Sequence, residues 1–92
     1  MILIDEAYHD YVTDPSYQSA VDIALTTPNV FVTRTFSKAY GLAGLRVGYG
    51  VADADAIALM NRIRQPFNVN ALAQAAALAA LEDESHTLEC VR

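Results

Sequence analysis

The residues most suited to chemistry gather around Lys38, the only lysine among 92 residues. Soluble proteins normally spread several lysines over their surface. This one lies between Ser37 and Ala39 in a glycine-containing stretch, with Thr35 upstream and Arg46 eight residues downstream. One amine, one guanidinium and two hydroxyls in such a turn indicate an amine nucleophile beside a bound anion.

A carboxylate and a phenol are expected to reach the same place. Asp5 directly follows the apolar run 2–4, and Tyr8 lies three residues later. The apolar run 30–33, a second strand candidate, precedes Lys38. In open α/β sheets, ligands bind beyond the carboxyl ends of the strands. We therefore expect these three side chains to face one crevice.

Pyridoxal 5′-phosphate (PLP) is one cofactor that uses every one of these groups. Its aldehyde needs a lysine amine, and its pyridine nitrogen needs a carboxylate. Its phenolate oxygen benefits from a hydroxyl donor, and its phosphate binds arginine and hydroxyl or backbone donors. We predict that Lys38 forms the imine and shuttles the proton, and that Asp5 contacts the ring nitrogen.

The remaining contacts to PLP are assigned in the same way. Tyr8 is predicted to donate to the phenolate oxygen, Arg46 and Ser37 are predicted to bind the phosphate, and Thr35 is a further candidate for the phosphate site. Each residue also has a plain structural alternative, such as a turn, core packing or an ion pair. A glycine-rich stretch that binds a simple anion without any cofactor is a separate alternative.

Composition indicates a globular protein and argues against binding of nucleic acid. The chain is 53% hydrophobic and carries a net charge of −5, whereas a surface for nucleic acid needs clustered lysines and arginines. A single cysteine, Cys90, and the widely separated His9 and His86 do not form a metal-binding pattern. With neither a signal peptide nor an apolar run of roughly 20 residues, we expect a cytoplasmic protein without membrane contact.

The predicted elements run strand, helix, strand, strand, helix, helix. Strands are expected at residues 2–4, 30–33 and 46–52, and the strand at 2–4 is expected to be buried. Helices are expected at residues 16–25, 54–64 and 71–81. Their predicted N-caps are, in order, Ser16, Asp53 and Asn70. The first crossover is long enough to return a parallel strand, which indicates an α/β class domain. Residues 1–92 are expected to form a single segment without an internal boundary.

Two features indicate a part of something larger. The chain begins directly in a strand that is expected to be buried, although termini usually lie outside a core. The helix expected at 71–81 is apolar almost all round, which is typical of a helix that is buried on all sides. A chain of 92 residues offers little surface to bury it. We therefore expect a longer polypeptide or another subunit to cover this helix.

The motifs resemble those of a known family. Asp5-Glu6-Ala7-Tyr8 and the later run Thr35-Phe36-Ser37-Lys38-Ala39-Tyr40-Gly41-Leu42-Ala43-Gly44-Leu45-Arg46 are similar to motifs of the class I/II aminotransferases of PLP fold type I. Within that family the chain is most similar to the histidinol-phosphate aminotransferases, to which residues 64–70 add a further likeness. The resemblance covers essentially the whole chain.

By this resemblance, Lys38 matches the Schiff-base lysine, Asp5 the pyridine-nitrogen aspartate and Tyr8 the O3′ tyrosine. Ser37 and Arg46 match phosphate ligands. The implied fold is α/β, namely the later part of the three-layer α/β/α large domain of the aspartate aminotransferase-like fold. The implied reaction transfers an amino group between an amino acid, or histidinol phosphate, and a 2-oxo acid such as 2-oxoglutarate. The family works as a homodimer.

Relatives with other reactions share the lysine segment. Aromatic aminotransferases and threonine-phosphate decarboxylase-like enzymes are alternatives, because the residues that select the substrate lie outside this chain. Chains of the family are several times longer and also carry a residue that stacks on the ring and an arginine for the substrate carboxylate. We therefore expect an active enzyme in the full-length parent and an inactive, truncated module in the isolated chain.

Overall fold

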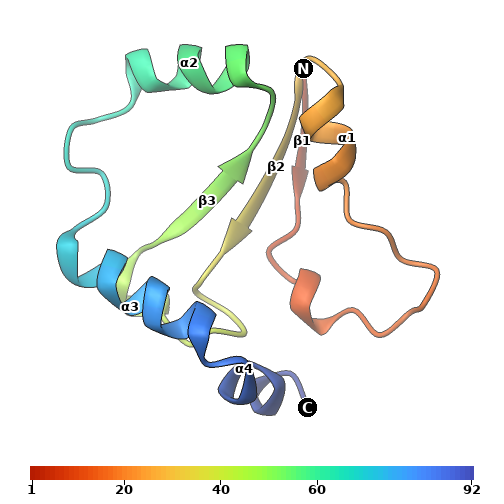
Figure 1. Cartoon of the computed structure of the whole chain (residues 1–92), viewed down its shortest axis with the longest axis vertical. Helices are drawn as coiled ribbons and strands as arrows, with labels where there is room; N and C mark the ends of the chain where they lie inside the picture. Colours follow the sequence, from red (N-terminus) through yellow and green to blue (C-terminus); the bar gives the residue numbers. More distant parts are fainter.

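The computed structural model describes residues 1–92 and has a three-stranded sheet at its centre (Figure 1). Strand β1 (Ile2–Asp5) pairs in parallel with β2 (Val30–Thr35), and β2 pairs antiparallel with β3 (Gly48–Val51). The predicted parallel return after the first crossover is confirmed. The carboxyl ends of β1 and β2 therefore lie at the same end of the sheet as the start of β3.

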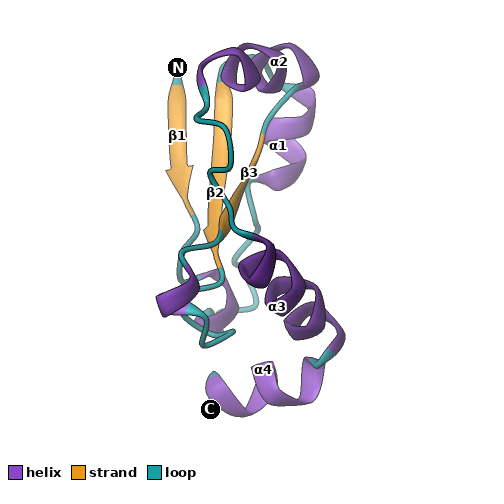
Figure 2. Ribbon diagram, turned by 90° about the vertical axis from the view of Figure 1, so that its left-hand side faces the viewer, coloured by secondary structure: helices purple, strands orange, loops and turns teal.

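Short helices surround this sheet. In chain order they are η1 (His9–Tyr11), α1 (Val21–Thr26), η2 (Ala43–Leu45), α2 (Ala54–Ile63), α3 (Ala71–Glu82) and α4 (Glu84–Cys90). Figures 1 and 2 show α2 near the end where β1 starts, and α3 and α4 toward the opposite end. None of these helices has the length and apolar character that crossing a lipid bilayer requires.

The helix predicted from Ser16 is wrong at its start. It begins at Val21, and Ala20 occupies the N-cap position without a side-chain hydrogen bond. Ser16 instead closes a turn, in which its amide and hydroxyl donate to Asp14 Oδ1 at 2.8 and 2.7 Å. The local bonding of an aspartate before proline therefore wins over helical periodicity.

The two other predicted N-caps are confirmed. The Asp53 side chain accepts two amide hydrogen bonds at the start of α2, and Asn70 Oδ1 accepts one from the Ala73 amide at 2.8 Å. Helix α4 was not predicted. It begins after Asp83, whose carboxylate accepts the His86 amide at 3.1 Å.

Two small apolar clusters join the elements. The first attaches α1 to the sheet and consists of Ala24, Val30 and Val32. The second attaches α3 to the segments on either side of η2 and consists of Phe36, Val47, Ala73 and Ala77. Helix α3 therefore supports the segment that carries Lys38.

Strand β1, which was expected to be buried, is exposed within these 92 residues, and helix α3 is left largely uncovered, as expected for a helix that needs surface from outside this chain. Strand β1 lies at the edge of the sheet, where Leu3 is 65% exposed. Helix α3 buries only Ala73 and Ala77, whereas Leu72 is 77% and Leu78 65% exposed. Both segments carry more apolar side chains than the remainder of this chain can cover, and an exposed apolar surface of this kind is typical of an interaction site.

Candidate cofactor site

The residues predicted to do chemistry lie at one end of the sheet. Asp5 ends β1, Lys38 follows β2, and Arg46 comes just before β3. Because β1 and β2 are parallel while β3 runs the other way, all three positions fall at the same end. This is the end of an open α/β sheet at which ligands bind.

Lys38 is exposed between two buried anchors. Phe36 is 5% and Ala39 0% exposed, so both fix the backbone on either side of Lys38. The turn is closed by the Gly41 amide, which donates to the Lys38 carbonyl at 2.9 Å, and by the Leu42 amide, which donates to the Phe36 carbonyl at 2.9 Å. Gly41 has a φ of +69°, a conformation that glycine adopts at little cost.

Of the predicted cofactor ligands, Tyr8 is the one whose side chain contacts Lys38. The Lys38 Nζ lies 5.3 Å from the centroid of the Tyr8 ring, within the range of a cation–π contact. Tyr8 is 61% exposed. Neither of the ion pairs in the chain includes Lys38, so its amine is available to a ligand.

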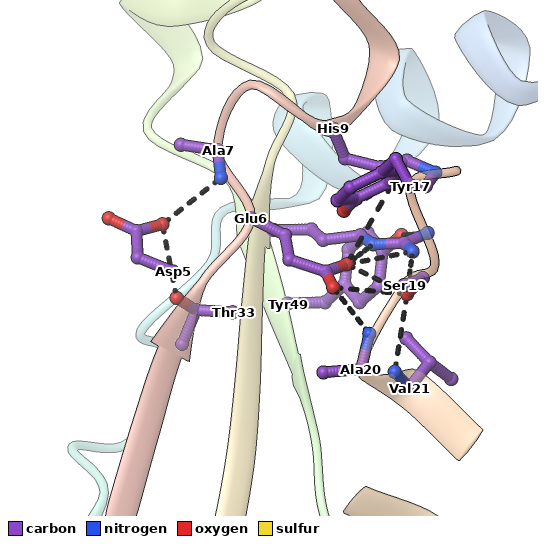
Figure 3. Close-up of polar contacts among 11 residues, drawn as sticks. Asp5, Glu6, Ala7, His9, Tyr17, Ser19, Ala20, Val21, Thr33 and Tyr49 are labelled. Carbon is purple, nitrogen blue, oxygen red and sulfur yellow. Dashed lines mark hydrogen bonds and ion pairs between the residues drawn. The ribbon is translucent and has the colours of Figure 1, made fainter. Parts of the chain in front are cut away.

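Asp5 is held by bonds to one of its two carboxylate oxygens. The Ala7 amide donates to Oδ1 at 3.1 Å, and the Thr33 hydroxyl donates to the same oxygen at 3.4 Å (Figure 3). Thr33 is the partner of Asp5 in the β1–β2 register, which explains this contact. The second oxygen has no hydrogen-bond partner within the chain, so it can contact a ligand.

Arg46 lies in a strained turn between η2 and β3. Its φ is +53°, which costs a residue other than glycine roughly 1–2 kcal/mol, and such residues are common at functional sites. Its guanidinium donates to the Ala43 carbonyl at 2.9 Å. The Ser37 amide donates to Thr35 Oγ1 at 3.0 Å, which brings two predicted phosphate ligands together, but no hydrogen bond joins either of them to Arg46.

The donor set suits a molecule with an aldehyde, a basic ring nitrogen and a phosphate. The amine, the carboxylate and the guanidinium form no ion pairs with one another. Each charge is therefore available, and together they match the three parts of PLP by charge and by hydrogen-bonding type.

An ion pair between the buried Glu6 and the partly exposed Arg34 escaped prediction from the sequence. Glu6 is 7% exposed, and its Oε2 lies 2.9 Å from Arg34 Nη2 and 3.0 Å from Arg34 Nε. The only signal is that Glu6 follows Asp5 while Arg34 follows Thr33, which becomes informative once the register of the two strands is known.

The surroundings of this pair keep both partners charged. Burial raises the pKa of Glu6, but hydrogen bonds from the Ala20 amide, Ser19 and Arg34 outweigh burial, so the pKa lies below its usual value of 4.5. Burial lowers the pKa of Arg34, but hydrogen bonds to Tyr49 and Glu6 outweigh it and raise this pKa above its usual value.

Comparisons with known proteins converge on one family. The model of the family "Aminotransferase class I and II" matches residues 1–92. The histidinol-phosphate aminotransferase 1 of Nitrosococcus oceani is 55% identical over 86 residues, which cover 94% of this chain and 23% of that protein.

Solved structures add two relatives. Histidinol-phosphate aminotransferase from Sinorhizobium meliloti, in complex with pyridoxal-5′-phosphate, is 36% identical with a TM-score of 0.88, and the match covers 97% of this chain and 24% of that one. L-Threonine-O-3-phosphate decarboxylase from Porphyromonas gingivalis is 30% identical with a TM-score of 0.74, covering 92% and 26% of the two chains. The chain thus spans about a quarter of the length of these relatives.

Proposed function

Because the chain belongs to the class I and II aminotransferase family, we propose that it forms the later part of the PLP-binding large domain of an aminotransferase working in the cytoplasm. The enzyme transfers an amino group between histidinol phosphate, or an amino acid, and a 2-oxo acid such as 2-oxoglutarate. The observation that carries this proposal is the unpaired Lys38 amine over Tyr8, at the sheet end that Asp5 and Arg46 share. A relative similar over most of this chain is a histidinol-phosphate aminotransferase, and a solved one binds PLP.

Three residues of this chain would handle protons in that reaction. When bound, PLP supplies an aldehyde that takes up an amine and a ring that accepts electron density. Lys38 would hold the aldehyde through its amine, and its Nζ, once displaced by the substrate amine, would take up and return a proton at the substrate carbon. Asp5 holds a proton on the ring nitrogen through its free carboxylate oxygen, and the Tyr8 hydroxyl donates to the phenolate oxygen.

The phosphate would be held by Arg46, Ser37 and Thr35. Arg46→Gln is expected to weaken PLP binding roughly 10–100-fold, because a hydrogen bond to a charged group contributes about 1.5–3 kcal/mol. Arg46→Lys should fall between this variant and the wild type, since it keeps the charge but loses the two-pronged geometry. Titration of the apoprotein with PLP, followed by absorbance, measures the affinity.

The matched control for this prediction is Arg62→Gln. Arg62 is an exposed arginine in α2, at the opposite end of the sheet from Arg46. Its replacement removes the same charge and should leave PLP affinity unchanged. Equal PLP affinities for Arg46→Gln and the wild type would show that Arg46 does not bind the phosphate.

Amino transfer from histidinol phosphate to 2-oxoglutarate tests the proposed function. The purified full-length parent protein with PLP should form glutamate in step with the loss of histidinol phosphate, whereas the 92-residue chain alone should form none. If neither histidinol phosphate nor any amino acid donates an amino group, the aminotransferase proposal fails. Release of carbon dioxide from threonine phosphate would instead support the second candidate, a decarboxylase, which the likeness to the Porphyromonas gingivalis enzyme favours.

We also propose that the protein assembles as a homodimer or self-associates through its apolar surface. Helix α3 supports this, because Leu72, Leu78 and Leu81 are 77%, 65% and 56% exposed. Replacing Leu72 and Leu78 together with glutamine should weaken self-association at least about tenfold, since burial of one leucine contributes roughly 1.5–3 kcal/mol. Sedimentation equilibrium measures the effect.

Leu59→Gln is the control for this prediction. Leu59 is 59% exposed on α2, so the substitution makes the same chemical change on a different helix. It should leave the association constant within error of the wild type. A wild-type protein that stays monomeric at high concentration would contradict self-association through α3.

A further inference from the structure

The Glu6–Arg34 ion pair, in which Glu6 is buried and Arg34 partly exposed, lies between the two segments that carry the predicted cofactor ligands. Glu6 follows Asp5 and precedes Tyr8, while Arg34 lies in β2, ahead of Lys38. Glu6 is the only charged residue of the chain that is buried. Figure 3 shows its carboxylate where the exit from β1 meets the chain that leads into α1.

Groups from two distant segments hold the Glu6 carboxylate. From the chain ahead of α1, the Ala20 amide donates to Oε1 at 2.7 Å, and the Ser19 hydroxyl lies 3.1 and 2.9 Å from Oε1 and Oε2. From β2, Arg34 donates to Oε2 through Nε at 3.0 Å, and its Nη2 also donates to the Ser19 hydroxyl at 2.8 Å. Both carboxylate oxygens are thus occupied within the chain, which indicates a constraint on geometry rather than a ligand site.

The alternation of side chains puts this pair on the sheet face opposite Asp5. Asp5 and Thr33 are register partners whose side chains meet, and Glu6 and Arg34 are the next residues along each segment. The Glu6 amide donates to the Thr33 carbonyl at 2.9 Å, and the Glu6 carbonyl accepts the His9 amide at 3.0 Å. Glu6 therefore fixes both the end of β1 and the turn that carries the next ligand.

We propose that the Glu6–Arg34 ion pair is a positioning device that fixes the Asp5–Tyr8 segment against β2 and so sets where the Asp5 carboxylate stands relative to Lys38. The inference rests on the proposed function, which gives these ligands their role. Removing Arg34 leaves the buried Glu6 carboxylate without its charge partner, and removing the Glu6 charge leaves the partly exposed Arg34 guanidinium unpaired, so either change weakens the link between the two segments. A displaced Asp5 would change the protonation of the bound cofactor and not only the stability of the fold.

Glu6→Gln in the purified full-length parent protein tests this proposal, because glutamine keeps the shape and removes the charge. PLP affinity, measured by titration of the apoprotein, should fall at least about tenfold. The pH midpoint of the visible absorption change of the bound cofactor should also shift. The matched control is Val30→Ala, which weakens the apolar cluster at the start of β2, the end away from the site.

The control separates positioning from stability. Val30→Ala should lower the thermal midpoint of the apoprotein yet keep the wild-type affinity and pH midpoint at a temperature where both variants are folded. If Glu6→Gln loses stability like the control but keeps wild-type affinity and pH midpoint, the positioning role is overturned. Arg34→Lys is a milder change that keeps the charge, and it should shift the PLP affinity and the pH midpoint in the same direction as Glu6→Gln. If Glu6→Gln does not fold, Arg34→Lys tests the positioning role in its place. Failure of the wild type to bind PLP would overturn the proposed function instead.

Discussion

Replacing Lys38 with alanine in the full-length parent protein is expected to reduce amino transfer by about 10⁴-fold or more. Proton transfer by a positioned side chain contributes roughly 10²–10⁴-fold by itself, and the same amine binds the aldehyde. These 92 residues contain no second lysine that could replace Lys38. The measurement is the initial rate of glutamate formation from histidinol phosphate and 2-oxoglutarate at saturating PLP.

Lys38→Arg is the control for this prediction. Arginine keeps a cation near the Tyr8 ring but stays protonated, so it cannot act as a nucleophile. It should fold like the wild type and be as inactive as the alanine variant. A rate within about tenfold of the wild type for either variant, which amounts to roughly 1.4 kcal/mol in the barrier, would contradict the role of Lys38.

Replacing Asp5 with asparagine is expected to lower the rate by about 10²–10³-fold, the loss typical of removing one electrostatic contact to a developing charge. A neutral amide does not favour a proton on the ring nitrogen as a carboxylate does. The fold should change little, because the side-chain oxygen of asparagine can still accept hydrogen bonds from the Ala7 amide and the Thr33 hydroxyl. The rate and the visible spectrum of bound PLP measure the effect.

Thr33→Val provides the comparison at the same place. It removes the 3.4 Å hydrogen bond to Asp5 Oδ1 but leaves the carboxylate and its charge. Its rate should stay far closer to that of the wild type than the rate of Asp5→Asn does. A wild-type rate for Asp5→Asn would show that Asp5 is only a turn residue at the end of β1.

Much of this molecule could be predicted because its signals are local. The family, the α/β class and the cofactor follow from a long motif around Lys38, and the first two are confirmed by the family match and the solved relatives. The N-caps Asp53 and Asn70 depend only on the residues that follow them. The cofactor contacts of Asp5, Tyr8, Thr35, Ser37 and Arg46 remain predictions.

The features that could not be predicted depend on contacts across the fold. Glu6 and Arg34 are separated by 28 positions, and only the parallel register of β1 and β2 brings them together. The start of α1 was misplaced because Ser16 bonds to Asp14 instead of capping a helix. The burial of β1 was also overstated, because an apolar run shows which side chains are apolar and not whether this chain has surface to cover them.

Borohydride reduction of the full-length parent protein after incubation with PLP, followed by peptide mass mapping, tests the central claim most directly. Reduction turns the bond between an amine and the PLP aldehyde into a stable secondary amine, so the labelled residue keeps its mark through digestion. We predict one pyridoxyl adduct, on the peptide that contains Lys38. An adduct found only at another position, or no adduct at all, would contradict the assignment of Lys38 as the residue that binds the cofactor.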